Sequence, residues 1–324
     1  MWLVWTSAAV GGFLLLVVIH DLIQRKHAIM RNFPIIGHFR YLLEAIGPEL
    51  RQYIVTSNDE ELPFNRDQRR WVYASSKKQD NYFGFGTDSD LEQSGNYLII
   101  KHSAFPIRSP SPGDPDYDPL YTVPVAKILG GYRKRRRAFR PPSIINVSAM
   151  SFGSLSGNAI HALNAGSCLA ACLHNTGEGG VSPHHLQGGD LIWQIGTGYF
   201  GCRDKHGDFS LDHLVETTNK HSSIRALEIK LSQGAKPGLG GILPASKITP
   251  EISRIRGIPM GVDCISPSSH SAFSDADSLL DFVETIAEAT GLPVGIKSAV
   301  GEMDLWHDLA RLSDTSERGL DFIT

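Results

Sequence analysis

Short β-rich segments alternate with helical segments from Pro141 to Thr324, and this alternation limits the fold more than any other feature. Strands that alternate with helices form a parallel sheet, either open or closed. We expect an α/β fold of the (β/α)8 TIM-barrel type. Because a closed barrel takes about 250 residues, we expect this one to be incomplete at its C-terminus. The expected strands are 144–149, 227–231, 261–265, 294–297 and 320–324, and the expected helices are 158–173, 249–256, 278–290 and 305–312.

The N-terminal segment is the second constraint, because residues 1–20 contain no Asp, Glu, Lys or Arg. A mostly apolar helix of about 20 residues can cross the hydrocarbon core of a membrane. A secretory signal would have a basic residue before the apolar run and a small-x-small cleavage site after it, and neither is present. Arg25, Lys26 and Arg31 follow the run, so the positive-inside rule predicts a single-pass protein whose bulk faces the cytoplasm. A buried core helix is the alternative.

The intervening region, 22–140, lacks strand–helix alternation. Apolar residues recur at helical spacing until Gly47–Pro48 interrupts them, and we expect 61–140 to be irregular. We expect the five bases RKRRR at 133–137 to form a solvated loop or to contact anionic lipid heads. Nucleic-acid binding is not expected, because it would need an overall basic chain and the net charge is −3. The expected domains are a transmembrane helix (1–21), a helical and irregular region that packs on the barrel (22–140) and the partial barrel (141–324).

Cysteine and histidine spacing predicts no metal site. The four cysteines form no framework of the secreted, disulfide-bonded kind. Cys168 and Cys172 lie four residues apart but have no further ligand nearby. His174, His184 and His185 lack an acidic or thiol partner at the usual zinc spacing. We therefore expect buried thiols and ordinary loop or core histidines.

The carboxyl ends of the expected strands are distinctive, and in parallel barrels these ends hold the ligand-binding residues. They combine small residues, which let the backbone approach a flat ring, with isolated polar and charged side chains. In chain order they are SAMSFGS (148–154), NTGEGG (175–180), Gln194 with GTGYFG (196–201), Lys230 and Gln233 with GAKPGLGG (234–241), and Lys297. A lysine at the end of an apolar strand indicates function rather than a solvated surface.

Four of these segments resemble, in the same order, the FMN-binding synthase domain of glutamate synthase. They are SAMSFGS, NTGEGG, EIKLSQGAKPG and GIPMGVDCISPSSH. The N-terminal apolar run and the segment HAIMRNFPIIGHFRYLLEAIGPELRQY (27–53) are similar to the shorter single-chain members, the FMN-binding glutamate synthase family proteins. The resemblance covers nearly the whole chain, and four ordered motifs make it specific.

The resemblance implies that FMN is the cofactor. It implies that the first-strand backbone at Ala149, Met150 and Ser151 lies against the isoalloxazine ring. It further implies that Asn175, Thr176 and Gln194 hydrogen-bond the pyrimidine edge, and that Lys297 lies near flavin N1 and the C2 carbonyl. A fixed cation at that place stabilises the anionic reduced flavin.

The resemblance also implies an oxidoreductase that acts on the imino or amino group of a small carboxylate substrate, such as 2-oxoglutarate or glutamate. Lys230, Gln233 and Lys236 match the substrate side, where cations meet carboxylates. Glu178, with Lys230, is the catalytic candidate because a carboxylate can exchange a proton with the substrate nitrogen. The alternative for Glu178 is that it only caps a turn.

Departures from the family change what we expect of the chain. Glutamate synthase makes ammonia in an N-terminal glutaminase domain, whereas here we expect a membrane helix at the N-terminus. The iron–sulfur cysteine spacing of the family is missing from 141–324, so an iron–sulfur cluster is not supported. Ammonia and electrons would come from elsewhere, the electrons from a donor protein. Tyr199–Phe200–Gly201 replaces the family's Arg-Phe-Gly, and Arg203 could supply the guanidinium to the substrate. The phosphate loops of such barrels follow the last strands, which we expect beyond Thr324.

Two other functions stay open from the sequence. One is a membrane-anchored flavin oxidoreductase of an unrelated small acid or a quinone, because one fold hosts many chemistries. The other is an inert truncated chain that serves as a membrane-attached scaffold. Flavin absorbance distinguishes the scaffold from both enzymes, and a panel of substrates distinguishes the two enzymes.

Overall fold

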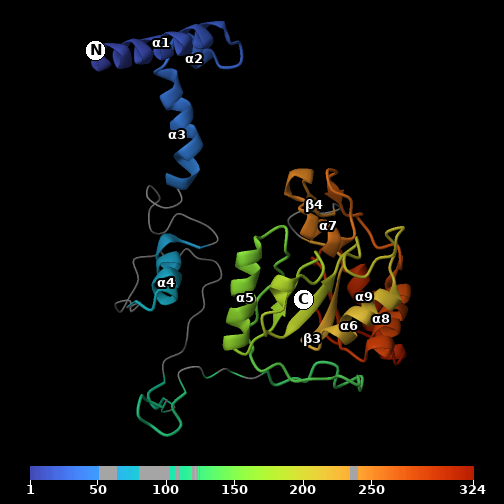
Figure 1. Cartoon of the computed structure of the whole chain (residues 1–324). Helices are drawn as coiled ribbons and strands as arrows, with labels where there is room; N and C mark the ends of the chain where they lie inside the picture. Colours follow the sequence, from blue (N-terminus) through green and yellow to red (C-terminus); the bar gives the residue numbers. More distant parts are fainter. Residues whose placement is uncertain are drawn as a thin grey trace. The chain divides into compact units, whose positions relative to one another are not determined.

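The computed structural model describes residues 1–50, 64–79, 103–106, 108, 110–118, 121, 123, 125–233 and 240–324. Contacts divide the chain into two compact units, Met1–Ile107 and Arg108–Thr324 (Figure 1). This division groups the described residues between 108 and 140 with the segment in which strands and helices alternate.

The first unit contains four helices in its described part, α1 (Trp2–Ile23), α2 (Ala28–Asn32), α3 (Gly37–Leu50) and α4 (Arg66–Ser76). Between Val4 and Ile23, α1 is long and apolar enough to cross a membrane. Asp21 near its end is fully buried and accepts a hydrogen bond from the backbone N–H of Ile35 at 3.0 Å. The same carboxylate lies 2.9 Å from Nε2 of His38. These contacts hold the start of α3 against the end of α1.

The helical spacing expected before Gly47–Pro48 is found in α3, and one expectation for the first unit is wrong. Helix α3 continues through Gly47–Pro48 to Leu50, because a proline close to the helix end removes only one backbone donor. Helix α4 lies in 61–140, which was expected to be irregular. It begins with a capping box, in which Asn65 Oδ1 accepts from the backbone N–H of Gln68 and Gln68 Oε1 accepts from the backbone N–H of Asn65.

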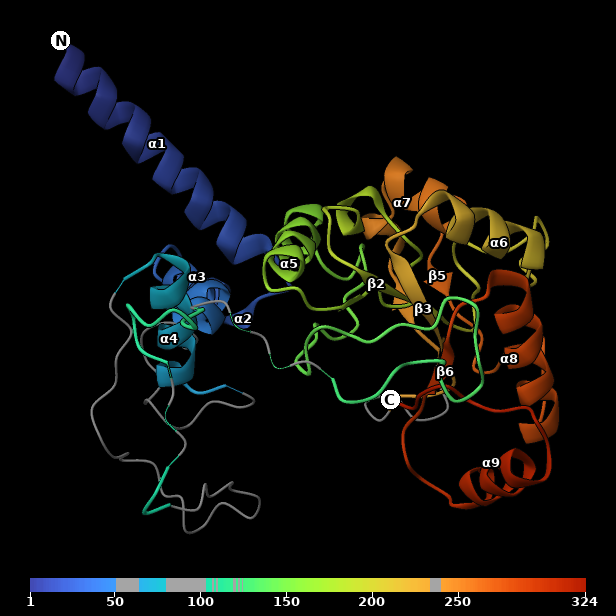
Figure 2. The same ribbon diagram turned by 90° about the horizontal axis from the view of Figure 1, so that it is seen from below.

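The second unit is built on a parallel sheet, in the order β1 (His174–Asn175), β2 (Leu191–Ile195), β3 (Ile224–Lys230) and β6 (Val294–Lys297). Single parallel bridges extend it at Val147 beside β1 and at Ile323 beside β6. Among the described strands the spatial order equals the chain order, without the reversal of a doubly wound sheet. The expected α/β class with a parallel sheet is confirmed. Figure 2 shows α5 (Gly157–Leu169), α6 (Leu211–Lys220), α8 (Ala276–Thr290) and α9 (Asp304–Thr315) in an arc around the strands.

The expected strands are found with one exception. Segment 294–297 is confirmed, 227–231 begins three residues earlier, and 144–149 and 320–324 pair through the two bridges. Segment 261–265 was expected to join the parallel sheet, and this is wrong. Its β5 (Cys264–Ile265) pairs antiparallel with β4 (Ile242–Leu243), because β6 occupies the place beside β3. This excursion between β3 and β6 also contains α7 (Pro250–Arg256). The sequence pattern did not predict β1, β2 or α6.

The core accounts for the apolar residues of β3, which include Ala226, Leu227 and Ile229. Its residues from Ala226 to Ile229 are fully buried on both faces, as is typical of parallel strands covered by helices. Helix α8 packs Leu280, Val283 and Ile286 into the same core. This helix begins at a capping Asp275 and ends at Gly291 in the left-handed conformation, with φ of 74°.

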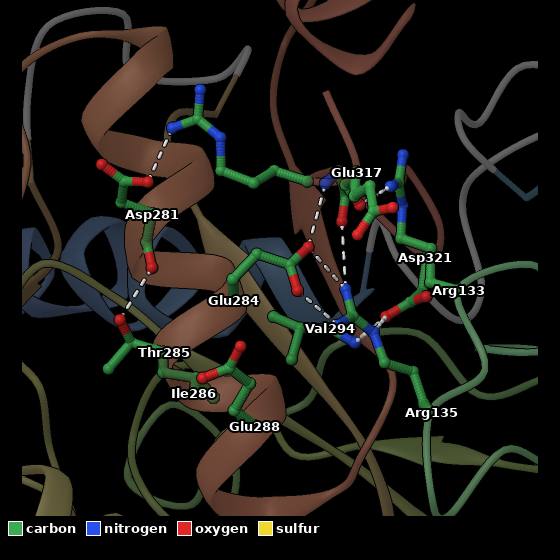
Figure 3. A network of polar contacts seen from close by, with 12 residues as sticks. Arg133, Arg135, Asp281, Glu284, Thr285, Ile286, Glu288, Val294, Glu317 and Asp321 are labelled. Carbon is green, nitrogen blue, oxygen red and sulfur yellow. Dashed lines mark hydrogen bonds and ion pairs between the residues drawn. The ribbon is translucent and has the colours of Figure 1, made fainter. Parts of the chain in front are cut away.

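Arg135 of the basic run 133–137 packs at the amino end of the sheet, so the expected solvated loop is wrong for this residue, whereas Lys134 and Arg136 are exposed (Figure 3). Arg135 is 8% exposed and binds both carboxylate oxygens of Glu284 on α8. Its Nε donates to Asp321 at 3.0 Å, and Asp321 also accepts from the backbone N–H of Val294, the first residue of β6. Arg135 therefore ties α8 and the final extended segment to the start of β6.

Candidate functional site

Polar side chains lie at the carboxyl ends of the parallel strands, as the sequence predicted. Asn175 ends β1, Gln194 is next to last in β2, and Lys230 and Lys297 end β3 and β6. Lys230 and Lys297 are direct register partners, and Gln194 is paired with Glu228. Because the strands all run in the same direction, these four side chains come to one edge of the sheet.

Glu228 is the central buried carboxylate of this edge, and the sequence interpretation had missed it. It is fully buried, and its Oε2 accepts hydrogen bonds from Asn175 Nδ2 at 2.7 Å and Gln194 Nε2 at 2.5 Å. Its Oε1 accepts from the hydroxyl of Thr324 at 2.6 Å. The signal for it was an acidic residue within an apolar strand. Thr176 lies beside this group, where its hydroxyl accepts from the backbone N–H of Gln194.

Lys230, Glu178 and Gln233 form a second polar group. Lys230 Nζ lies 2.9 Å from Glu178 Oε1 and donates to Gln233 Oε1 at 2.8 Å. A Cβ at Gly196 would approach Glu178 Oε2 to 2.5 Å, and one at Gly241 would approach Oε1 to 3.0 Å. Glycine at these two positions therefore makes room for the carboxylate. The structure brings two of the predicted substrate-side residues, Lys230 and Gln233, together with the catalytic candidate Glu178.

The segment Ala149–Ser151 follows the bridge at Val147 and is half-buried. The backbone N–H of Met150 donates to the carbonyl of Asn175, and its carbonyl lies 3.0 Å from His185 Nε2. A Cβ at Gly177 would lie 2.8 Å from the backbone nitrogen of Ser151, so only glycine allows this close approach. These contacts hold the first strand end beside the end of β1.

Arg256 is a second residue that the sequence interpretation had missed. It is 7% exposed, its Nη2 donates to the carbonyl of Phe152 at 3.1 Å, and its Nε is buried without a partner among the described residues. A Cβ at Gly153 or Gly179 would lie 3.1 or 3.0 Å from its Nη2. No carboxylate in the described part of the chain pairs with it. A buried, incompletely paired cation therefore lies between the first two strand-end loops.

Two predicted residues do not join this group. Arg203 lies over the Phe200 ring at 5.7 Å and lines a cavity of about 400 Å³ with His206, Asp208 and Ser271. Among the described residues, no contact connects Arg203 with Lys230. Lys236 lies outside the described residues.

His270 connects the excursion to the end of β3. Its Nε2 lies 2.9 Å from the carbonyl oxygen of Lys230, and its Nδ1 lies 3.1 Å from the hydroxyl of Tyr199. Burial lowers the pKa of His270 and outweighs the opposing hydrogen bond to Lys230. Burial also raises the pKa of the fully buried Cys202 thiol. A neutral His270 donates from Nε2 and accepts from Tyr199.

No three His, Cys, Asp or Glu side chains come together in the described ranges in an arrangement that could hold a metal ion. The polar groups described at this edge include side-chain amides, two lysines, Arg256 and two carboxylates. Such a fold and edge are typical of α/β proteins that bind ligands at the carboxyl ends of a parallel sheet.

Comparison with known proteins identifies the family. Residues 131–321 match the conserved region in glutamate synthase. The chain is 35% identical, over 95% of its length, to the glutamate synthase large subunit-like protein YerD of Bacillus subtilis, and the match covers 63% of that protein. It is 37% identical, over 54% of its length, to the archaeal-type glutamate synthase (NADPH) of Thermotoga maritima, of which 32% is covered. The chain belongs to the glutamate synthase family, and it spans less than two thirds of these relatives.

Proposed function

We propose that this chain is a membrane-anchored, FMN-dependent oxidoreductase of the glutamate synthase type. It acts on the imino or amino group of a small carboxylate substrate such as 2-oxoglutarate or glutamate. The observation that carries the proposal is the group of Lys230, Glu178 and Gln233 at the end of β3. Family membership supports the oxidoreductase class.

The first three strand ends fit an FMN ring by their donor set. Small side chains and half-buried backbone at Ala149–Ser151 suit a flat ring, and Met150 is a soft apolar contact. Amide and hydroxyl groups of Asn175, Thr176 and Gln194 match the carbonyls and N–H of its pyrimidine edge. Lys297 adds a cation at the end of β6. When bound, FMN supplies a hydride to the imino carbon.

The substrate's carboxylates would meet the cations of this edge. Arg256 is buried and has no carboxylate partner in the described part of the chain, so an anionic ligand would complete its pairing. Lys230 provides the second cation, and Lys236 would add a third. Glu178 can give a proton to the imino nitrogen while carbon receives the hydride, which converts C=N to CH–NH. Two electrons per turnover then come from a donor protein.

We further infer that the sheet closes into a TIM-type barrel, because its strands follow chain order without reversal. Helix α1 spans the membrane, and Arg25, Lys26 and Arg31 keep the second unit on the cytoplasmic side. Protease added outside right-side-out vesicles should leave that unit intact. Its digestion would contradict the orientation.

Full-length protein, solubilised in detergent, tests the activity. Purified protein should show flavin absorbance, and after anaerobic reduction 2-oxoglutarate with ammonium should reoxidise the flavin. Lys230→Met should raise the 2-oxoglutarate concentration needed for half-maximal reoxidation about 100-fold, because a charge-assisted contact contributes about 1.5–3 kcal/mol. Reoxidation by a quinone but not by 2-oxoglutarate would instead favour the other flavin enzyme.

A further inference from the structure

Glu228 lies at the centre of the sheet as a fully buried carboxylate. In the described ranges no lysine, arginine or histidine pairs with it. Burying an ionised group costs several kcal/mol unless hydrogen bonds compensate. A leucine or isoleucine would suit this strand position better for packing alone, since its neighbours Leu227 and Ile229 are fully buried. The carboxylate therefore requires an explanation beyond the stability of the core.

Among the described residues, each hydrogen bond to the side-chain carboxylate of Glu228 comes from a side chain at a different strand end. Asn175 and Gln194 donate to Oε2, and Thr324 donates to Oε1. These donors belong to β1, to β2 and to the extended segment beside β6. The carboxylate consequently joins three parts of the chain that are separated by 34 to 96 residues from it.

These bonds determine how each amide is turned. An amide carries its two N–H donors on one side and its carbonyl acceptor on the other. Asn175 directs its NH2 to Glu228 and its Oδ1 to the backbone N–H of Gly177 at 3.0 Å, so both ends are engaged. Gln194 directs its NH2 to Glu228 and therefore turns its Oε1 away from the carboxylate. Gln194 Oε1 is thereby left as an acceptor for a ligand.

We propose that Glu228 is the positioning residue of the ring site, an inference that rests on the proposed FMN function. The pyrimidine edge of the flavin has one N–H, and this N–H lies between two carbonyls. Glu228 fixes the amide of Gln194 so that Oε1 accepts a hydrogen bond from this N–H. It also places a fixed negative charge in the low-dielectric sheet, which disfavours electron-rich reduced flavin. Glu228 acts through Asn175 and Gln194 and through its charge, without touching the ring.

Three variants of full-length protein test this role by FMN titration, followed by flavin fluorescence, and by the reduction potential of bound FMN. Glu228→Gln keeps the shape but removes the charge and lets the amides turn over. We expect FMN affinity to fall about ten-fold, as for loss of one well-placed hydrogen bond, and the potential to become more positive. Glu228→Asp keeps the charge but shortens the reach, so affinity should fall while the potential stays near that of the unaltered protein.

Thr324→Val is the matched control, because it removes a hydrogen bond to Oε1 and leaves both amides bound. Its affinity and potential should be unchanged. If Glu228→Gln does not fold, the FMN affinity of Glu228→Asp tests the role of Glu228. If unaltered protein binds FMN and the Glu228 variants that fold bind it with unchanged affinity, the role of Glu228 is overturned and the proposed cofactor is not. Failure of unaltered protein to bind FMN would overturn both this role and the proposed cofactor.

Discussion

The two ends of the parallel sheet use charge differently. At the amino end Arg135 meets two carboxylates, and its pKa is raised, first by the hydrogen bond to Glu284. Burial by itself would raise the pKa of Glu284, but the hydrogen bonds from Arg135 and Gly319 outweigh burial. The pKa of Glu284 is therefore lowered. At the carboxyl end Arg256 is buried with an unpaired Nε and no carboxylate partner in the described ranges.

This difference indicates separate tasks for the two ends. A buried ion pair whose hydrogen bonds are satisfied holds elements together, and losing one partner leaves a buried charge uncompensated. A buried cation without a carboxylate partner forms no such ion pair and is available to an anionic ligand. Parallel barrels commonly divide stability and ligand binding between their two ends in this manner.

The largest expected effect is on stability, from Arg135→Met. Glu284 and Asp321 would remain at the amino end without their cation, and we expect unfolding free energy to fall by about 3–5 kcal/mol. Denaturant titration of the solubilised protein measures this loss. Arg136→Met is the control, because exposed Arg136 only donates to the carbonyl of Glu288. A similar loss in both variants would mean that the ion pair has no special role.

An effect of intermediate size on stability is expected from a change of pH, through His174, the first residue of β1. Burial, followed by the charge of His185, lowers the pKa of His174 to about 4. Protonation of His174 therefore favours the unfolded chain. The contribution of neutral His174 to the free energy of unfolding is present above a pH of about 6.5 and is lost as the pH falls toward 4. Between pH 7 and 5 this loss should be about 1–2 kcal/mol.

His174→Gln isolates this contribution, because its amide oxygen can still accept the hydrogen bond that Asn164 directs to the ring. The slope of stability against pH should be shallower in this variant. His161→Gln is the control, since His161 is exposed. An equal slope in the unaltered protein and both variants would show that His174 does not determine the acid sensitivity.

The smallest stability effect is expected at the carboxyl end, from Arg256→Met. Methionine keeps much of the packing and removes a desolvated charge, so unfolding free energy should change by less than about 1 kcal/mol. Affinity for 2-oxoglutarate should nevertheless fall more than ten-fold. A stability loss as large as that of Arg135→Met would remove the distinction between the two ends.

Part of this arrangement could be predicted from sequence patterns. Strand β6 was predicted at its observed bounds, because an apolar VGIK run follows a helix with a clear 3.6-residue period and a Gly–Leu–Pro stop. Strand β1 could not be predicted, because two residues show no periodicity. Segment 261–265 was misassigned to the main sheet because an extended segment carries no information about which strand it pairs with.

Strand–helix alternation by itself determined that the sheet is parallel, and with it that Lys230 and Lys297 share one edge. Only tertiary structure decided which charges are paired. Arg135 was one base in a run of five, and its partners Glu284 and Asp321 lie 149 and 186 residues away. A side chain's local sequence specifies its charge and its backbone conformation, whereas its partner and its burial depend on elements that packing brings beside it.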